Sequence, residues 1–136
     1  MVSDEKLLEL FGMALEASKN SYSPYSKFPV GAAILTNDGR IYTGCNVENR
    51  SYGLTNCAER TAAFTAVAEG SRRFAAIAIA APKADYPVGP CGACRQVLTE
   101  FADGSVPVIF GTKIGNLQKA TLGELYPFDS LHELAD

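Results

Sequence analysis

Apolar residues are spaced along the chain in a way that predicts four helices. In the first, apolar side chains such as Leu7 and Phe11 recur every three or four positions, the period of a helix with one buried face. Ser3 is suited to cap this helix, and Gly70 is suited to end the second one. The predicted helices are residues 3–20, 57–69, 92–102 and a short one that a capping-box pattern opens at residue 121.

Five shorter apolar runs predict strands. The first two flank Asn37-Asp38-Gly39, a strong hairpin signal, and should pair antiparallel at one side of a sheet. The third is almost continuously apolar, as expected of a central strand that is buried on both faces. The predicted strands are residues 29–36, 40–45, 74–81, 106–111 and 116–120. The element order αββαβαβ predicts an α/β fold, with a mixed five-stranded sheet covered by helices on both faces.

The composition narrows the classes of protein to which the chain can belong. Its 136 residues predict one domain, residues 1–136, and an apolar share of 47% suffices for a core. The formal net charge of -3 argues against a general nucleic-acid binder, which presents a basic face, but it is compatible with a small neutral ligand. No apolar run is long enough to cross a membrane and the N-terminus lacks a signal-peptide pattern, so we expect a cytoplasmic protein.

The four cysteines indicate either disulfide bonds or a metal site. Disulfides suit small secreted proteins, whereas this chain has an apolar core and no export signal. Cys91 and Cys94 form a C-x-x-C pair, which can bind one metal ion from a single turn, and Cys57 can supply a third thiolate. Three protein ligands leave the fourth tetrahedral position open to water, as in a catalytic zinc site. Three thiolates favour zinc among divalent ions, with iron as the alternative.

One carboxylate accompanies these cysteines. Glu59 follows Cys57 by two residues, close to the expected metal yet free to move protons. Its alternative is a structural one, a capping box at the start of helix 57–69 with Asn56 as the N-cap. Cys45 lies outside the pattern, and we expect it to be a buried, small apolar side chain.

The pattern Cys57-Ala58-Glu59 with Pro90-Cys91-Gly92-Ala93-Cys94 resembles the zinc-dependent cytidine deaminases, in the all-cysteine variant of their metal site. Residues 25–33, YSKFPVGAA, and residues 46–49, NVEN, also match that family. The resemblance implies a three-layer α/β/α cytidine deaminase fold, one zinc ion per subunit, and a homotetramer whose active sites are shared between subunits. The implied reaction is hydrolytic deamination of cytidine and 2′-deoxycytidine to the uridine forms with release of ammonia, a step of pyrimidine salvage. Glu59 would shuttle the protons.

The same resemblance implies which residues bind the substrate. Asn46 and Glu48 match residues that hold the ribose hydroxyls, a task that suits an amide and a carboxylate. Phe28 matches an aromatic residue that stacks against the pyrimidine ring, with plain core packing as its alternative. The backbone amide of Ala58 is expected to contact the base.

Two further aromatic residues match positions that contact a neighbouring subunit in that family. Phe128 lies about where these enzymes send an aromatic side chain into a neighbour's site, and Tyr52 is a second candidate for a subunit contact.

The charge of the expected metal site favours a nearby cation. Three thiolates and one Zn²⁺ sum to a negative charge, which the N-termini of the two predicted site helices offset in part. By resemblance, Arg60 donates hydrogen bonds to the cysteine sulfurs, and the alternative is a surface or structural arginine. Arg95 is expected to support packing.

Other functions stay open at this point. A related deaminase that acts on a cytosine nucleoside antibiotic such as blasticidin S is the nearest alternative, although Glu48 suits a free ribose. An enzyme that edits RNA or DNA is disfavoured because the chain is acidic. A non-enzymatic structural zinc domain would need a fourth ligand, for which Cys45 is the candidate, and would leave Glu59 idle. His132, the one histidine, is expected to lie on a surface helix rather than at the metal.

Overall fold

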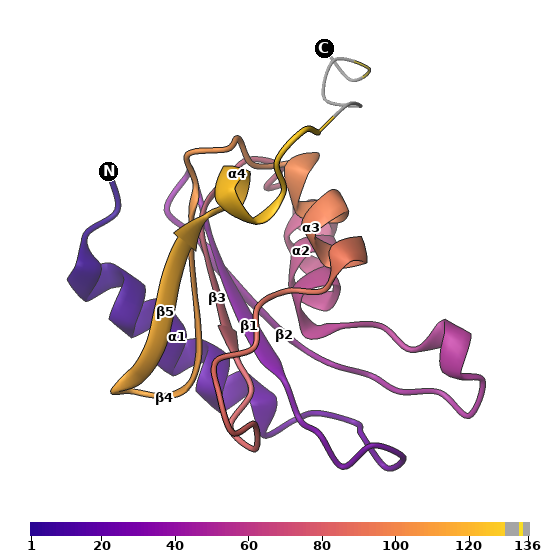
Figure 1. The fold of residues 1–136 in the computed structure, drawn as a ribbon. Coiled ribbons are helices and arrows are strands. Elements are labelled where there is room, and N and C mark those ends of the chain that lie inside the picture. Colours follow the sequence, from indigo (N-terminus) through magenta and orange to yellow (C-terminus); the bar gives the residue numbers. More distant parts are fainter. Residues whose placement is uncertain (130–133, 135–136) are drawn as a thin grey trace.

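The computed structural model describes residues 1–129 and 134, and it shows a sheet with helices packed on both sides (Figure 1). Its elements follow the predicted order, with a short 3-10 helix added in the polar loop after the second strand. In chain order they are α1 (Asp4–Ser18), β1 (Gly31–Thr36), β2 (Ile41–Cys45), η1 (Tyr52–Leu54), α2 (Ala58–Ala68), β3 (Phe74–Ala80), α3 (Gly92–Thr99), β4 (Pro107–Lys113), β5 (Asn116–Thr121) and α4 (Leu122–Leu125).

The sheet is mixed and has five strands, as predicted, in the order β2-β1-β3-β4-β5. Among the strand pairs of the described residues, β3 and β4 run parallel and the others antiparallel. The predicted hairpin is present between β1 and β2, and Gly39 in its turn has a φ of 84°, which suits glycine. The central position of β3 explains why the apolar run that predicted it is nearly continuous.

Successive residues of β1 point to opposite faces of the sheet and so contribute to two cores. Ala33 and Leu35 belong to the cluster that includes Phe11 of α1. Ala32 and Ile34 belong to the other cluster, which is built with residues of α2 and α3. Helix α1 therefore covers one face, while α2 and α3 cover the other, and the three-layer α/β/α prediction is confirmed (Figure 1).

Helix α2 lies against β2 at the distance that only a glycine permits. A Cβ atom at Gly44 would lie 2.4 Å from the backbone nitrogen of Ala62 and 2.8 Å from the carbonyl oxygen of Ala58. The backbone of the helix thus rests directly on the strand, which fixes the first turn of α2 relative to the sheet.

Most predicted elements differ in length from those observed, and hydrogen bonds explain two of the differences. Helix α3 ends at Thr99 rather than at residue 102, because the N–H groups of Glu100 and Phe101 donate to the third residue before them, Val97 and Leu98, instead of continuing the α-helical pattern. Strand β1 begins at Gly31 rather than at residue 29, since the N–H of Val30 donates to a side chain, Oδ1 of Asn46, over 2.9 Å.

The predicted N-terminal caps of α1 and α4 are present. Ser3 caps α1, its Oγ accepting from the N–H of Lys6 over 3.1 Å, and Thr121 and Glu124 form the capping box that opens α4. None of the helices in the described part of the chain has the length and apolar character needed to cross a membrane.

Candidate metal centre and active site

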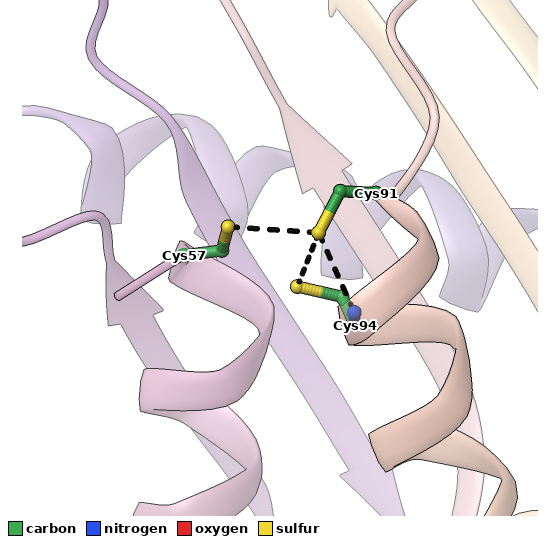
Figure 2. A group of neighbouring side chains, drawn as sticks. All are labelled: Cys57, Cys91 and Cys94. Atoms are coloured by element: carbon green, nitrogen blue, oxygen red, sulfur yellow. Dashed lines mark hydrogen bonds between the residues drawn. The ribbon is translucent and has the colours of Figure 1, made fainter. Parts of the chain in front are cut away.

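Two helix N-termini meet beside the sheet and bring three cysteines together (Figure 2). Cys57 is the N-cap of α2, Cys91 is the N-cap of α3, and Cys94 lies in the first turn of α3. The prediction that Asn56 caps α2 is wrong. Asn56 instead forms an isolated antiparallel bridge with Val47, in which each backbone nitrogen lies 2.9 Å from the other residue's carbonyl oxygen. The chain is therefore still extended at Asn56, and the helix begins one residue later than predicted.

The three sulfur atoms are spaced as a tetrahedral metal site requires. The Sγ atoms of Cys57 and Cys91 are 3.8 Å apart, those of Cys91 and Cys94 are 3.4 Å apart, and all three lie within 4.8 Å of one another. Zinc–sulfur bonds of about 2.3 Å in a tetrahedron place sulfurs about 3.8 Å apart, so the donor set fits Zn²⁺ in both chemistry and spacing. Figure 2 shows the three side chains pointing toward one another from the two helices.

The remaining cysteine and the histidine do not belong to this cluster as the structure describes it. Cys45 is half-buried at the end of β2, not fully buried as expected, and partial burial raises its pKa. His132 lies outside the described residues, so its expected surface position stays a prediction. Within residues 1–129 and 134 the candidate metal group is Cys57, Cys91 and Cys94, which leaves one tetrahedral position for a water or substrate atom.

Positive charge surrounds the sulfurs. The Nη2 of Arg60 donates to the Sγ of Cys57 over 3.3 Å, which places this arginine where the charge of the cluster calls for a cation. Hydrogen bonds with Cys94 and with Arg60 lower the pKa of Cys57 to about 5, while the bond to Cys57 raises the pKa of Arg60. The helix N-termini at Cys57 and Cys91 add to this effect. The hydrogen bond to Cys57 raises the pKa of Cys94, so of these two thiols it is Cys57 that favours the thiolate, the form that binds metal.

Glu59 lies in the first turn of α2 and is only 4% exposed. Burial raises its pKa to about 7, so the carboxyl group can hold and release a proton near neutral pH. The capping-box alternative does not hold, because the N-cap is Cys57 and the third helical residue is then Arg60. Nothing in the first turn of α2 gives Glu59 a structural role of that kind.

A cavity of about 380 Å³ opens beside the metal cluster. Its volume falls within the usual range for a small-molecule site. The predicted functional residues that line it are Phe28, Asn46, Glu48, Cys57, Ala58, Glu59 and Cys91. Cys94 is fully buried beneath it. Residues from four separate parts of the sequence thus share one small cavity.

Asn46 faces this cavity with an amide group that is largely engaged by the protein. Its Oδ1 accepts from the N–H of Val30 over 2.9 Å and from the hydroxyl of Ser21 over 2.5 Å. Its Nδ2 donates to the carbonyl oxygen of Phe28 over 2.9 Å. One N–H of the amide is left to bind a ligand, so Asn46 both orients the loop before β1 and presents a single donor.

Glu48 is held by the loop that precedes β1. Its Oε1 accepts from the N–H groups of Tyr25 and Ser26 over 3.0 and 3.2 Å, and its Oε2 accepts the hydroxyl of Ser26. The hydrogen bond from the Ser26 hydroxyl is the main reason that the pKa of Glu48 is below its ordinary value. Sequence reasoning did not single out Ser26, although it belongs to the run 25–33.

Arg95 has a larger structural role than the packing that was expected. Its Nε donates to the carbonyl oxygen of Pro90 over 2.7 Å, and its Nη1 donates to the carbonyl oxygen of Leu125 over 2.8 Å. It therefore joins the segment just before Cys91 to the end of α4.

Tyr52 and Phe128 lie away from the cavity of this subunit. The ring of Tyr52 is 75% exposed on η1 and packs edge to face on Tyr25, with 5.9 Å between ring centroids. Phe128 is 99% exposed and has a φ of 58°. Their expected contacts with a neighbouring subunit stay predictions.

Comparison with known proteins identifies relatives over most of the chain. Residues 4–110 match the family model described as the cytidine and deoxycytidylate deaminase zinc-binding region. A cytidine deaminase of Sporosarcina psychrophila is 51% identical over 119 residues, which cover 88% of this chain and 87% of the relative. A crystal structure of cytidine deaminase from Burkholderia pseudomallei superposes with a TM-score of 0.83 at 46% identity, covering 93% of this chain and 98% of that one. A blasticidin-S deaminase of Bacillus cereus is more distant, at 35% identity over 88% of this chain and 89% of the relative.

Proposed function

The chain belongs to the zinc-binding family of cytidine and deoxycytidylate deaminases, and on this premise we propose that it deaminates free cytidine and 2′-deoxycytidine. The products are uridine and 2′-deoxyuridine with ammonia, a reaction that serves pyrimidine salvage. The observation that carries the proposal is the buried carboxyl group of Glu59 beside three convergent thiols, all at one small cavity.

Different residues of the chain carry out different parts of the proposed reaction. A bound zinc ion supplies a Lewis acid and a water molecule of lowered pKa. Glu59 takes a proton from the water as the water oxygen bonds to C4, and delivers that proton to ring nitrogen N3. It then takes the proton of the new C4 hydroxyl and gives it to the amine, so that the bond between C4 and the amine breaks, ammonia leaves and the C4 carbonyl of uridine forms. A pKa of about 7 suits a group that must accept and donate a proton in one cycle. Arg60 holds the Cys57 sulfur and balances its charge.

The opposite wall of the cavity binds the nucleoside. Glu48 accepts a sugar hydroxyl, and the free N–H of the Asn46 amide donates to another. Phe28 packs against the pyrimidine ring. Ala58 is the first helical residue of α2, and its N–H is one of the helix N-terminal donors that have no partner inside the helix, so it is available to the base.

The direct test is the ultraviolet absorbance change of cytidine mixed with the purified protein, compared between the wild type and Glu59→Ala. The wild type is expected to convert cytidine to uridine, while Glu59→Ala keeps its zinc and loses nearly all turnover. A zinc-loaded wild type that leaves cytidine and 2′-deoxycytidine unchanged would overturn the proposal, and blasticidin S would then be tried.

The two alternatives are less well supported. The relative that acts on blasticidin S is 35% identical, against 51% for the cytidine deaminase relative. A structural zinc domain requires four closed ligands, whereas three cysteines converge at an open cavity in the described residues.

We also propose a homotetramer with shared active sites. Large apolar side chains are exposed outside the cavity, among them Tyr52 and Leu54 on η1, and Phe128 near the end of the described chain. Such groups are the kind that a subunit interface covers. Light scattering that gave the mass of one subunit would contradict this proposal.

Two further predictions concern the chain as a whole. A cytoplasmic location is supported by four free thiols, which a reducing compartment preserves. The division into one domain, residues 1–136, likewise stays a prediction.

A further inference from the structure

We infer that Ser26 is a positioning residue for Glu48 and thereby sets how tightly the enzyme holds the sugar of its substrate. The inference rests on the proposed function, in which Glu48 accepts a sugar hydroxyl. Ser26 lines the same cavity as Glu48, Phe28 and Glu59.

Glu48 needs such a partner because it lies in an exposed loop after β2, outside any helix or strand. A free glutamate loses rotamer entropy when it is fixed on a ligand. Three donors hold this carboxylate before the substrate arrives, and two of them belong to Ser26: its backbone N–H, at 3.2 Å from Oε1, and its hydroxyl, which donates to Oε2. Oε1 already accepts two N–H groups, whereas Oε2 accepts only the Ser26 hydroxyl, so Oε2 has the position that a sugar hydroxyl requires.

The direction of the Ser26 hydroxyl proton follows from its other hydrogen bond. Its Oγ accepts the N–H of Phe28 over 3.1 Å. The Ser26 hydroxyl has a single proton, and one lone pair of its oxygen accepts the N–H of Phe28. The carboxylate of Glu48 has no proton to donate, so the hydroxyl proton is directed to Glu48. The turn that makes this possible contains Lys27, which has a φ of 58°, and is closed by the Lys27 N–H donating to the carbonyl oxygen of Ser23 over 3.0 Å.

One hydroxyl therefore connects the residue proposed to bind the sugar with the backbone of the residue proposed to stack on the base. Loss of this hydroxyl leaves the two backbone N–H groups on Oε1 but frees Oε2 to rotate toward water. We expect the loss to weaken substrate binding and to leave proton transfer at Glu59 intact.

The test compares Ser26→Ala with Ser26→Thr, which retains the hydroxyl and places its methyl group on an exposed residue. Loss of one hydrogen bond to a charged group is expected to raise KM for cytidine about tenfold, with kcat and zinc content close to those of the wild type. Ser26→Thr is expected to restore KM to within about threefold of the wild type. Tyr22→Phe, which removes a hydroxyl from an exposed residue of the same loop, is the control and should leave KM unchanged.

A background without the carboxylate separates action through Glu48 from a general loop effect. In Glu48→Ala, adding Ser26→Ala should change KM by less than about twofold, because the acceptor of the Ser26 hydroxyl is already absent. If Ser26→Ala has the KM of Tyr22→Phe, or if its effect persists in full in Glu48→Ala, the inference is wrong.

A second measurement tests the role of Ser26 even if the protein does not deaminate cytidine. Calorimetric titration with uridine makes the same comparison without turnover. A wild type that binds uridine about tenfold more tightly than Ser26→Ala supports the positioning role even if cytidine is not deaminated, and equal affinities contradict it.

Discussion

The guanidinium of Arg95 donates a hydrogen bond to the carbonyl oxygen of Leu125 over 2.8 Å, a contact that spans 30 residues of sequence. The Nε of the same side chain donates to Pro90, whose ring is fully buried next to Cys91. The segment that carries two metal ligands is therefore fastened to the end of α4.

Arg95→Met should expose this connection. It removes two donors and leaves two carbonyl oxygens unpaired, which is expected to lower the free energy of unfolding by about 1–3 kcal/mol. The variant should also release zinc to a competing chelator faster than the wild type does. A colorimetric assay of metal release measures the two rates. Arg72→Met, in the exposed turn before β3, is the control. Equal release rates for the two variants would show that Arg95 does not support the metal segment.

Replacing Cys57 and replacing Cys45 should have different effects on the zinc content of the protein. Cys57→Ser removes one of three converging ligands, so zinc content after dialysis should fall to a small fraction of the wild-type value, with loss of turnover. Cys45→Ser is the matched control because Cys45 lies outside the cluster, and it should retain one zinc per subunit. Metal analysis of both variants measures this. Loss of zinc from Cys45→Ser would contradict the three-cysteine site.

Stability at low pH should depend on Asp38 in the β1–β2 turn. The hydrogen bond from the Thr36 hydroxyl holds the pKa of Asp38 below its ordinary value of 3.8, and Arg40 lies 3.5 Å from its Oδ2. The unfolded chain therefore binds the proton first as pH falls. The contribution of the carboxylate is present above pH 3.8 and is lost as pH falls through the lower folded-state pKa.

Urea unfolding of the wild type and Asp38→Asn across pH measures this effect. The wild type should be the more stable protein near neutral pH, and the difference should shrink as the pH falls below 3.8. A difference that is the same at both ends of the range would show that Asp38 does not act through its charge.

Two glycines should respond to alanine in opposite directions. At Gly44 the new Cβ would lie 2.4 Å from the nitrogen of Ala62, so Gly44→Ala should separate β2 from α2 and destabilise the protein by about 1–3 kcal/mol. At Gly12, within α1, nothing lies within 4 Å of the new Cβ, so Gly12→Ala should stabilise by up to about 1 kcal/mol. Thermal unfolding of both variants measures the contrast. A Gly44→Ala variant as stable as the wild type would show that α2 can shift freely on the sheet.

Periodicity and turn chemistry were enough to predict the layers of the fold. The apolar runs of β1 and β3 and the glycine in the 37–39 turn each reflect local rules that the folded chain obeys. The cysteine cluster was also predictable, because the C-x-x-C spacing restricts two candidate ligands to one turn, and the third cysteine precedes a glutamate by two residues.

The features that the sequence did not reveal depend on contacts between distant segments. The N-cap of α2 is Cys57 rather than the predicted Asn56, because Asn56 pairs with Val47. No local sequence pattern predicts that bridge. Asn46 was expected to hold a sugar hydroxyl, and the sequence did not indicate that Ser21, Phe28 and Val30 engage most of the hydrogen-bonding groups of its amide. Partners of this kind are known only once the loops are placed.

The position of β1 between β2 and β3 has a consequence for the order in which the protein matures. Cys57 follows β2, whereas Cys91 and Cys94 follow β3, and β1 lies between these two strands and pairs with both. An unfolded chain can offer a metal ion the two thiols of the C-x-x-C turn, a weaker chelate than three. Tight metal binding therefore indicates that these three strands have assembled. A chain that stops folding before that stage should bind the metal more weakly, and its metal affinity alone distinguishes it from the folded protein.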